Sequence, residues 1–287
     1  AMGSPCEIQL YAADAPDADR LAALAIAEVE RLEARYSRYR DDSFLSQINR
    51  VASAGGSIAV DDETASLLNY AHACQRESEG LFDISSGILR RAWRFDRNEL
   101  PDPAQIEALL ALVGWEKLRW VPPLLEFPLP GMELDFGGVV KEYAVDRAAA
   151  SCQEAGAQHL MLNLGGDIRI LGAQPDGSPW RIGIRHPRQR GAMCQTLSLH
   201  AGGIASSGDY ERCITRGGVR YGHILHPKTG WPVRHLTSVS VVADLCVVAG
   251  SAATIAMLKQ ERGPAWLAAL GLPHLWVDVH GQTGGSL

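Results

Sequence analysis

The sequence predicts an α+β fold with largely antiparallel sheets flanked by helices. Two observations support this class. Runs with helical spacing dominate the first half of the 287-residue chain, and short alternating or β-forming runs dominate the second half. The β-forming runs follow one another across Gly, Pro and Asp turns, as hairpins do, instead of alternating regularly with helices as in a parallel sheet.

The first half is predicted to contain one strand followed by several helices. Residues 7–13 alternate like a strand, and residues 17–39 carry an apolar stripe at helical spacing made of Leu21, Leu24, Ala25, Val29 and Leu32. Further helices are expected over residues 41–50, 61–78 and 102–114. The last of these has proline at its start and glycine just past its end. Glycines break up residues 80–95.

The second half is predicted to be mostly strands, together with two helices. The first helix begins near Val139 and places Val140, Ala144 and Ala148 on one side, which we expect in the core. Strand-forming runs follow over residues 159–173, 180–187, 195–208, 238–246 and 274–280, and an Ala-rich helix is expected over residues 247–261. There is no internal repeat or charged linker, so we expect one domain over residues 1–287.

Composition narrows the classes of protein. A hydrophobic fraction of 46% is globular, and a net charge of −6 disfavours nucleic-acid binding, which needs clustered Lys and Arg. No run of about 18 apolar residues could span a bilayer, and no signal peptide is visible. The six cysteines lack C-x-x-C spacing, so we expect ordinary buried thiols and no zinc site.

The stretch "LDFGGVVKEYAVDRAAA" at residues 134–150 has two interpretations. Asp135 leads into Gly137 and Gly138, and Lys141 lies in the first turn of the helix that follows. Glycines let a ligand approach the backbone, and the start of a helix favours negative charge, so this is a candidate anion site. The alternative is an ordinary strand-to-helix turn with a solvated pair between Lys141 and Glu142.

Two further glycine-rich turns favour a phosphate-rich ligand. "NLGGDIRILG" at residues 163–172 is by itself equally consistent with an ordinary hairpin turn and with a ligand site. "GGIASSGDYERC" at residues 202–213 offers Ser206, Ser207 and Gly208 as hydroxyl or backbone donors. None of the three turns matches a P-loop or a Rossmann fingerprint. Together they indicate a phosphate-bearing ligand more strongly than any one of them does alone.

The segment "YGHILHPKTGWPV" at residues 221–233 holds two histidines. His223 and His226 have H-x-x-H spacing, but no third ligand of matching type stands nearby for a zinc ion. His223 is better interpreted as a general base or as a hydrogen-bond donor to phosphate. No G-x-S-x-G sequence supports a serine hydrolase.

Taken together, these segments resemble the ApbE-type flavin transferases, which are FAD:protein FMN transferases. The resemblance covers nearly the whole chain in order, through "AMGSPCEI", "ARYSRYRDDSFLSQIN", "GLFDISSGILRRAW", "ELDFGGVVKEYAVDRAAA", "NLGGDIRILG", "ASSGDYER", "YGHILHPKTGWPV" and "SVSVVADLCVVAGSAATIAML". Each motif is weak alone, and eight in the same order make a strong signal.

The resemblance implies a T-fold-like α+β architecture of two lobes, with FAD in the cleft between them and Mg²⁺ on its pyrophosphate. It implies transfer of FMN to a Ser or Thr hydroxyl of an acceptor protein, with release of AMP. The implied acceptor is a membrane-associated redox protein, and nucleic acid is not an expected partner. Family members usually work at the cell envelope, although a cytoplasmic location is also open.

Matched positions imply roles for individual residues. His223, as general base, and Lys141 are the expected catalytic residues. The carbonyl of Val140 and the hydroxyl of Thr254 match metal ligands. The positions expected to contact FAD or shape its cleft are Met2, Tyr39, Phe82, Asp83, Trp93, Gly137, Gly138, Lys141, Gly166, Asp167, Gly208 and Asp209.

The chain departs from the family pattern at three positions. Gly250 stands where the motif usually has the metal-binding Asp, Glu142 stands where a glycine usually follows the helix lysine, and His226 replaces an Asp. Our hypothesis is that Glu142 supplies the missing carboxylate as a metal ligand. The rival is a solvent-facing Glu142 with a weak or absent metal site. Two other functions therefore stay open, namely FAD hydrolysis to FMN and AMP, and FAD binding without catalysis.

Overall fold

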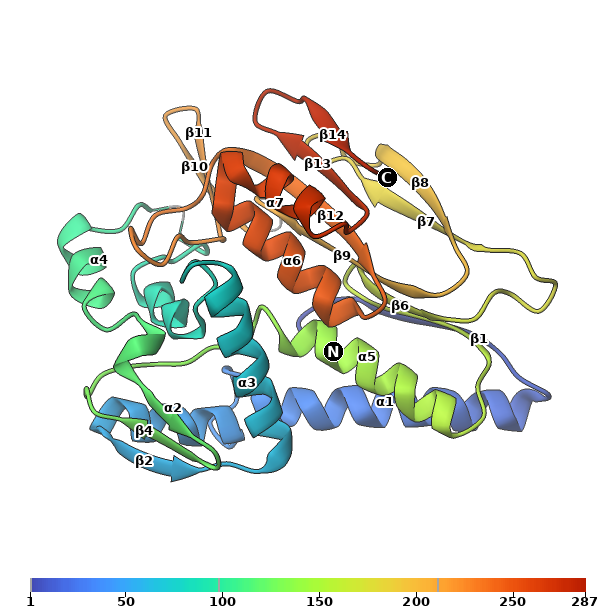
Figure 1. Ribbon diagram of the computed structural model, residues 1–287, viewed down its shortest axis with the longest axis horizontal. Helices are drawn as coiled ribbons and strands as arrows, with labels where there is room; N and C mark the ends of the chain where they lie inside the picture. Colours follow the sequence, from blue (N-terminus) through green and yellow to red (C-terminus); the bar gives the residue numbers. More distant parts are fainter. Residues whose placement is uncertain (1, 98, 211) are drawn as a thin grey trace.

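The computed structural model describes residues 2–97, 99–210 and 212–287, and its mixture of helices with antiparallel sheet confirms the predicted α+β class (Figure 1). The α-helices are α1 (Ala15–Tyr36), α2 (Phe44–Ala54), α3 (Asp62–Glu77), α4 (Pro103–Leu110), α5 (Val140–Glu154), α6 (Cys246–Lys259) and α7 (Gly263–Ala269). Short 3₁₀ helices are η1 (Ile84–Arg91), η2 (Trp115–Lys117) and η3 (Gln260–Arg262).

The main sheet has seven strands in the order β1-β5-β6-β9-β12-β13-β14, and all its neighbours pair antiparallel. Its strands are β1 (Cys6–Tyr11), β5 (His159–Leu164), β6 (Asp167–Leu171), β9 (Gly202–Gly208), β12 (Leu236–Ala243), β13 (His274–Asp278) and β14 (Thr283–Gly285). The smaller sheets are β2-β4-β3 (Gly56–Ala59, Leu124–Phe127, Arg119–Val121), β7-β8 (Trp180–Arg185, Met193–Leu199) and β10-β11 (Cys213–Arg216, Val219–Gly222).

Alternation along the strands gives the main sheet two apolar faces. In β5, Leu160 and Leu162 belong to the core that includes α5 and α6, whereas Met161 joins a second core with Ile182 and Ile184 of β7. Successive side chains of a strand point to opposite faces, so the helices cover one face and the β7-β8 hairpin covers the other.

The predicted apolar faces of the helices are largely confirmed. Val140, Ala144 and Ala148 of α5 are buried, and α5 lies alongside α1 (Figure 1). The stripe on α1 is buried as well, apart from Leu24, which is 38% exposed. Side-chain caps fix the starts of α1, α2 and α3, where Asp14, Ser43 and Asp61 accept backbone N–H bonds.

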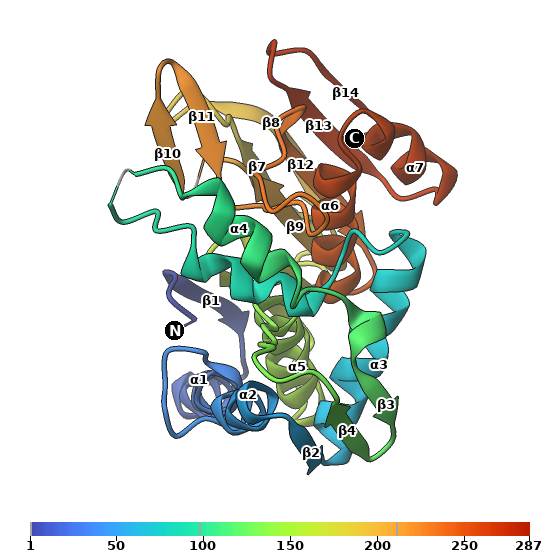
Figure 2. The ribbon, with the colours of Figure 1, turned by 90° about the vertical axis from the view of Figure 1, so that its left-hand side faces the viewer.

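Some sequence expectations need correction. Residues 84–91 form a 3₁₀ helix, and the pairs β2-β4-β3 and β10-β11 were not predicted; Figure 2 shows the latter projecting beside β9. Among the cysteines, Cys74, Cys152 and Cys246 are buried as expected, but Cys6 is exposed and Cys194 and Cys213 are half-buried. Within the described residues, no helix is both long and apolar enough to cross a membrane.

Candidate active site

The turn that leads into α5 is fixed by its aspartate. Asp135 Oδ1 accepts a hydrogen bond of 2.9 Å from the Gly137 N–H, and Oδ2 pairs with the Arg38 guanidinium. A Cβ added at Gly138 would lie 3.4 Å from Phe82 Cζ, so the aromatic ring packs directly on the second glycine. The structure therefore brings the predicted residues Phe82, Gly137 and Gly138 together at one turn.

Lys141 joins this turn to the hairpin between β5 and β6. Its Nζ lies 2.6 Å from Asp167 Oδ2, and the side chain of Asp167 is 4% exposed. Burial lowers the pKa of Lys141, but the carboxylates of Asp167 and Glu142 outweigh that effect and raise it above the ordinary value. The interpretation of residues 141 and 142 as a solvated ion pair is therefore wrong, because Lys141 pairs with a buried partner from another element.

The glycines of the hairpin allow close approach to Lys141. Gly165 has φ +65°, and a Cβ there would lie 2.6 Å from Ser4 Cβ and 3.8 Å from Lys141 Nζ. The Gly166 N–H donates to Asn163 Oδ1 at 2.8 Å. Only glycine combines this backbone conformation with this lack of space, which explains the Gly-Gly sequence of the turn.

Glu142 is a buried carboxyl group. Its side chain points toward α6, where a Cβ added at Gly250 would lie 2.6 Å from both Glu142 Cγ and Oε1. Burial first, and then the neighbouring Asp167 carboxylate, raise the pKa of Glu142 to about 8. The predicted alternative of a solvent-facing Glu142 is thereby excluded, since the residue is only 7% exposed.

Helix α6 connects Glu142 to the third glycine-rich segment. Thr254 lies one turn beyond Gly250, so the two share a face of the helix. Its hydroxyl is 2.8 Å from the Ser207 hydroxyl of β9, and Ser207 directly precedes Gly208. Asp209 follows, held by two hydrogen bonds from Arg188 at 2.6 and 2.7 Å.

His223 lies next to this segment. A Cβ added at Gly222 would lie 2.8 Å from Asp209 Cβ, which places the exposed His223 beside the Asp209 turn. His226 is half-buried, and its Nδ1 accepts from the Lys228 N–H at 3.2 Å. Burial, reinforced by the Lys228 charge, lowers the pKa of His226.

The remaining predicted residues differ in how accessible they are. Tyr39 is 71% exposed, and its hydroxyl lies 3.4 Å from Arg212 Nη1 across 173 residues of chain. Met2 is half-buried and its N–H donates to Glu33 at 2.6 Å. Trp93 is buried, and its Nε1 donates to the Gly230 carbonyl at 2.7 Å.

Asp83 has a structural role in this conformation. Its Oδ1 accepts from the Ser85 N–H and hydroxyl at 2.9 and 2.6 Å, and its Oδ2 accepts from the Trp115 N–H at 2.8 Å. These bonds cap η1 and tie it to η2. A contact between Asp83 and FAD stays a prediction.

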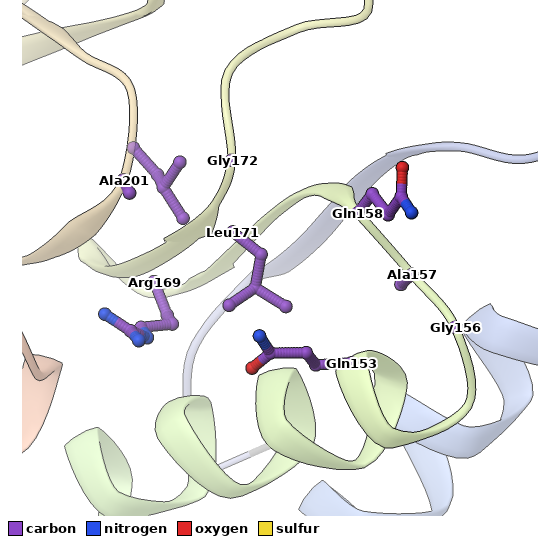
Figure 3. Close-up of a pocket in the computed structure, with 9 residues that line it drawn as sticks. Gln153, Gly156, Ala157, Gln158, Arg169, Leu171, Gly172 and Ala201 are labelled. Atoms are coloured by element: carbon purple, nitrogen blue, oxygen red, sulfur yellow. The ribbon is translucent and has the colours of Figure 1, made fainter.

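Cavities and side-chain clusters do not identify the site by themselves. The cavity in Figure 3, with a volume of about 510 Å³, is lined by Gln153, Gly156 and Arg169, near the far end of α5 from Lys141. A second cavity, of about 450 Å³, lies beside Asp83 and Lys228. In the described part of the chain, no group of three or more His, Cys, Asp or Glu side chains is placed to hold a metal ion.

Residues 2–276 match the model of the ApbE family. The chain belongs to this family. It is 32% identical to an FAD:protein FMN transferase of Vibrio cholerae over 257 residues, which cover 87% of the chain and 76% of that protein. A relative with the same name from Rhodobacter capsulatus is 34% identical over 79% of the chain, but the match spans only 45% of that relative's length.

Solved structures of ApbE proteins have the same fold as this chain. The flavin transferase ApbE of Vibrio cholerae superposes with a TM-score of 0.88 at 30% identity, covering 99% of this chain and 94% of that one. The ApbE protein of Thermotoga maritima superposes with a TM-score of 0.91 at 27% identity, covering 100% and 94%. This ApbE chain therefore has the architecture that its sequence resemblance implied.

Sequence reasoning missed the residues that support the predicted site. Arg38 holds Asp135 and Arg188 holds Asp209. Ser207 was expected as a donor of the 202–213 turn, but its contact with Thr254 was not. Asp146 of α5 accepts N–H bonds from the first two residues of α6, at 3.0 and 2.9 Å, and so fixes the helix that carries Gly250. Each of these pairs is at least 21 residues apart in sequence, so local patterns carry no signal of it.

Proposed function

We propose that this ApbE chain transfers FMN from FAD to a Ser or Thr hydroxyl of an acceptor protein and releases AMP. The observation that carries the proposal is the meeting of three distant glycine-rich turns. Lys141 links the 134–150 stretch to the 163–172 hairpin, and Thr254 and Glu142 link both to the 202–213 segment through α6. The names of the family's relatives agree with this activity.

The reaction replaces a phosphoanhydride bond with a phosphate ester bond. The acceptor oxygen forms a bond to the phosphorus of the FMN half, the P–O–P anhydride bond breaks, and AMP leaves with the electron pair. The acceptor proton passes to His223, which acts as general base. Histidine suits this role because its unperturbed pKa, about 6.5, leaves a neutral, proton-accepting form at pH 7.

Lys141 and the glycine turns stabilise the phosphate charge in this proposal. Asp167 orients the Lys141 ammonium at 2.6 Å and favours its charged form. Gly137 and Gly138 carry no side chains that would keep the pyrophosphate from the start of α5, and Asp135 fixes the turn by accepting from the Gly137 N–H. Fixed donors of this kind lower the barrier because they need no reorganisation when charge develops.

The remaining component of the proposed site is a magnesium ion, and the oxygen atoms of Val140, Thr254 and Glu142 are suitable ligands for it. The Val140 carbonyl and the Thr254 hydroxyl are hard ligands, and the carboxyl group of Glu142 lies against Gly250, one helical turn from Thr254. Its Oε2 is buried and has no hydrogen-bond partner among the described residues. When bound, Mg²⁺ would neutralise pyrophosphate oxygens. Thr254 is kept in position by its 2.8 Å contact with Ser207.

The acceptor belongs to the same proposal. We expect a membrane-associated redox protein with a Ser or Thr flavinylation site, modified at the cell envelope. Covalently bound flavin survives denaturing electrophoresis and fluoresces. A fluorescent band in the membrane fraction that disappears when this gene is deleted would support the assignment, whereas a band confined to soluble cytoplasmic proteins would contradict it.

The activity is tested by weighing the products of one incubation. The protein is mixed with FAD, Mg²⁺ and a Ser- or Thr-containing acceptor peptide, and the variant His223→Asn is run in parallel. A peptide that gains FMN in the natural protein but not in the variant supports the proposal. Free FMN with AMP would instead indicate hydrolysis, and unchanged FAD would indicate binding alone.

A further inference from the structure

The structure contains a buried carboxylate whose charge is poorly compensated. Glu142 is 7% exposed, and within the described residues its Oε2 has no hydrogen-bond partner. Lys141, the adjacent cation, is engaged with Asp167 at 2.6 Å. An unpaired buried carboxylate costs free energy, so such groups normally neutralise or bind a cation.

The surroundings of Glu142 are rich in negative charge. Asp167 of β6 and Asp146 of α5 both act on it electrostatically, and the opposing charge comes from Lys141. Asp146 is itself occupied by N–H bonds from the start of α6 and by Arg169 at 3.5 Å. Three carboxyl groups, those of Glu142, Asp146 and Asp167, therefore stand against two cations, Lys141 and Arg169. A bound cation would supply the missing positive charge.

The absence of a side chain at Gly250 makes space for the side chain of Glu142. Gly250 lies inside α6, where glycine costs about 1 kcal/mol relative to alanine. A side chain there could not coexist with Glu142 as placed, since its Cβ would lie 2.6 Å from Glu142 Cγ and Oε1 and 2.9 Å from Cδ. The carboxylate carried by α5 therefore fills the space that a side chain on α6 would otherwise take.

Hard oxygen ligands lie on the same side of α6. Thr254 is one turn from Gly250, and its hydroxyl contacts that of Ser207 at 2.8 Å. A buried carboxylate against Gly250 and a hydroxyl one helical turn away offer the hard oxygen ligands that Mg²⁺ prefers, and Mg²⁺ commonly completes its octahedron with water and substrate oxygens.

We propose that the Glu142 carboxylate is the anionic ligand of the divalent cation in this transferase, delivered from α5 into space left by Gly250. The proposal rests on the proposed function for the presence of the cation. It makes Glu142 and Gly250 a coupled pair, so a carboxylate at position 250 should replace one at position 142 when the two are exchanged together.

The test is calorimetric titration of Mg²⁺ into four proteins, each with and without FAD. These are the natural chain, Glu142→Gln, Gly250→Asp, and the exchange variant Glu142→Gly with Gly250→Asp. We expect Glu142→Gln to bind Mg²⁺ at least tenfold more weakly and the exchange variant to recover to within about threefold. Gly250→Asp alone should unfold at a lower temperature, because its new side chain meets Glu142.

Thermal unfolding in EDTA provides the control for folding. The isosteric Glu142→Gln should be at least as stable as the natural chain without metal, since it removes a buried carboxyl group whose Oε2 has no hydrogen-bond partner among the described residues, and Mg²⁺ should no longer raise its Tm. Equal Mg²⁺ affinity of the natural chain and Glu142→Gln would overturn the proposal, as would a folded exchange variant that does not recover binding.

The same samples separate the two proposals. FMN attachment to the peptide by a chain that shows no Glu142-dependent Mg²⁺ binding would refute the role of Glu142 and leave the transferase function intact. Conversely, Glu142-dependent Mg²⁺ binding without FMN attachment would support the cation site and refute the transferase function.

Discussion

Replacing Lys141 by methionine should affect stability and catalysis for different reasons. The lysine contacts Asp167 at 2.6 Å, and the Asp167 side chain is 4% exposed while that of Lys141 is 28% exposed. Removing one partner of a fully buried ion pair costs about 3–5 kcal/mol. Because Lys141 keeps some contact with solvent, we expect Lys141→Met to lower the free energy of unfolding by a little less, about 2–4 kcal/mol.

A second substitution separates the two effects. Asp167→Asn in the Lys141→Met background removes the buried carboxylate that has lost its lysine, so much of the lost stability should return. FMN transfer should stay about 100-fold below that of the natural chain, since the phosphate charge still lacks its cation. Thermal unfolding and mass spectrometry of the acceptor peptide measure the two quantities on the same samples.

Two results would refute this reasoning. Unchanged stability of Lys141→Met would show that the contact with Asp167 contributes nothing to folding. Full FMN transfer by the double variant would show that the lysine serves only to neutralise Asp167 and does not act on the phosphates.

Substitutions at three further positions test the elements that hold the site. Asp146→Ala removes both side-chain acceptors at the start of α6 and should lower the free energy of unfolding in chemical denaturation by about 2–3 kcal/mol, whereas Asp146→Asn keeps one acceptor oxygen and should lose less. Equal losses would show that the oxygen retained by asparagine contributes nothing. Trp93→Phe removes the 2.7 Å bond to the Gly230 carbonyl and should lower the free energy of unfolding by about 1–3 kcal/mol, whereas no change would show that water replaces it. Arg188→Lys keeps the charge but loses the paired hydrogen bonds to Asp209, so its thermal unfolding should fall between that of the natural chain and Arg188→Met.

The sequence predicts the regular elements because their signals are local. The apolar spacing of α1 and α5 appears in the structure as buried faces, whereas α6, β5 and β6 are buried on nearly all sides. The three-residue β3 and the four-residue β2 and β4 escaped prediction because so short a strand shows too few alternations to stand out.

The site is less predictable, since its contacts connect distant segments. Glycine turns and Lys141 could be singled out from sequence, but the partner of Lys141 could not. Glu142 shows most clearly that local sequence does not predict such long-range contacts. Next to a lysine in the first turn of a helix, a glutamate ordinarily faces water, and only the packing of α5 on α6 against Gly250 buries it.

The ratio of AMP released to FMN attached tests the central claim most directly. With FAD, Mg²⁺ and an acceptor peptide, chromatography measures free AMP, and mass spectrometry measures the peptide that carries FMN. Transfer predicts one AMP for each FMN attached, with no accumulation of free FMN. AMP that appears together with an equal amount of free FMN, while the peptide keeps its original mass, would contradict the account.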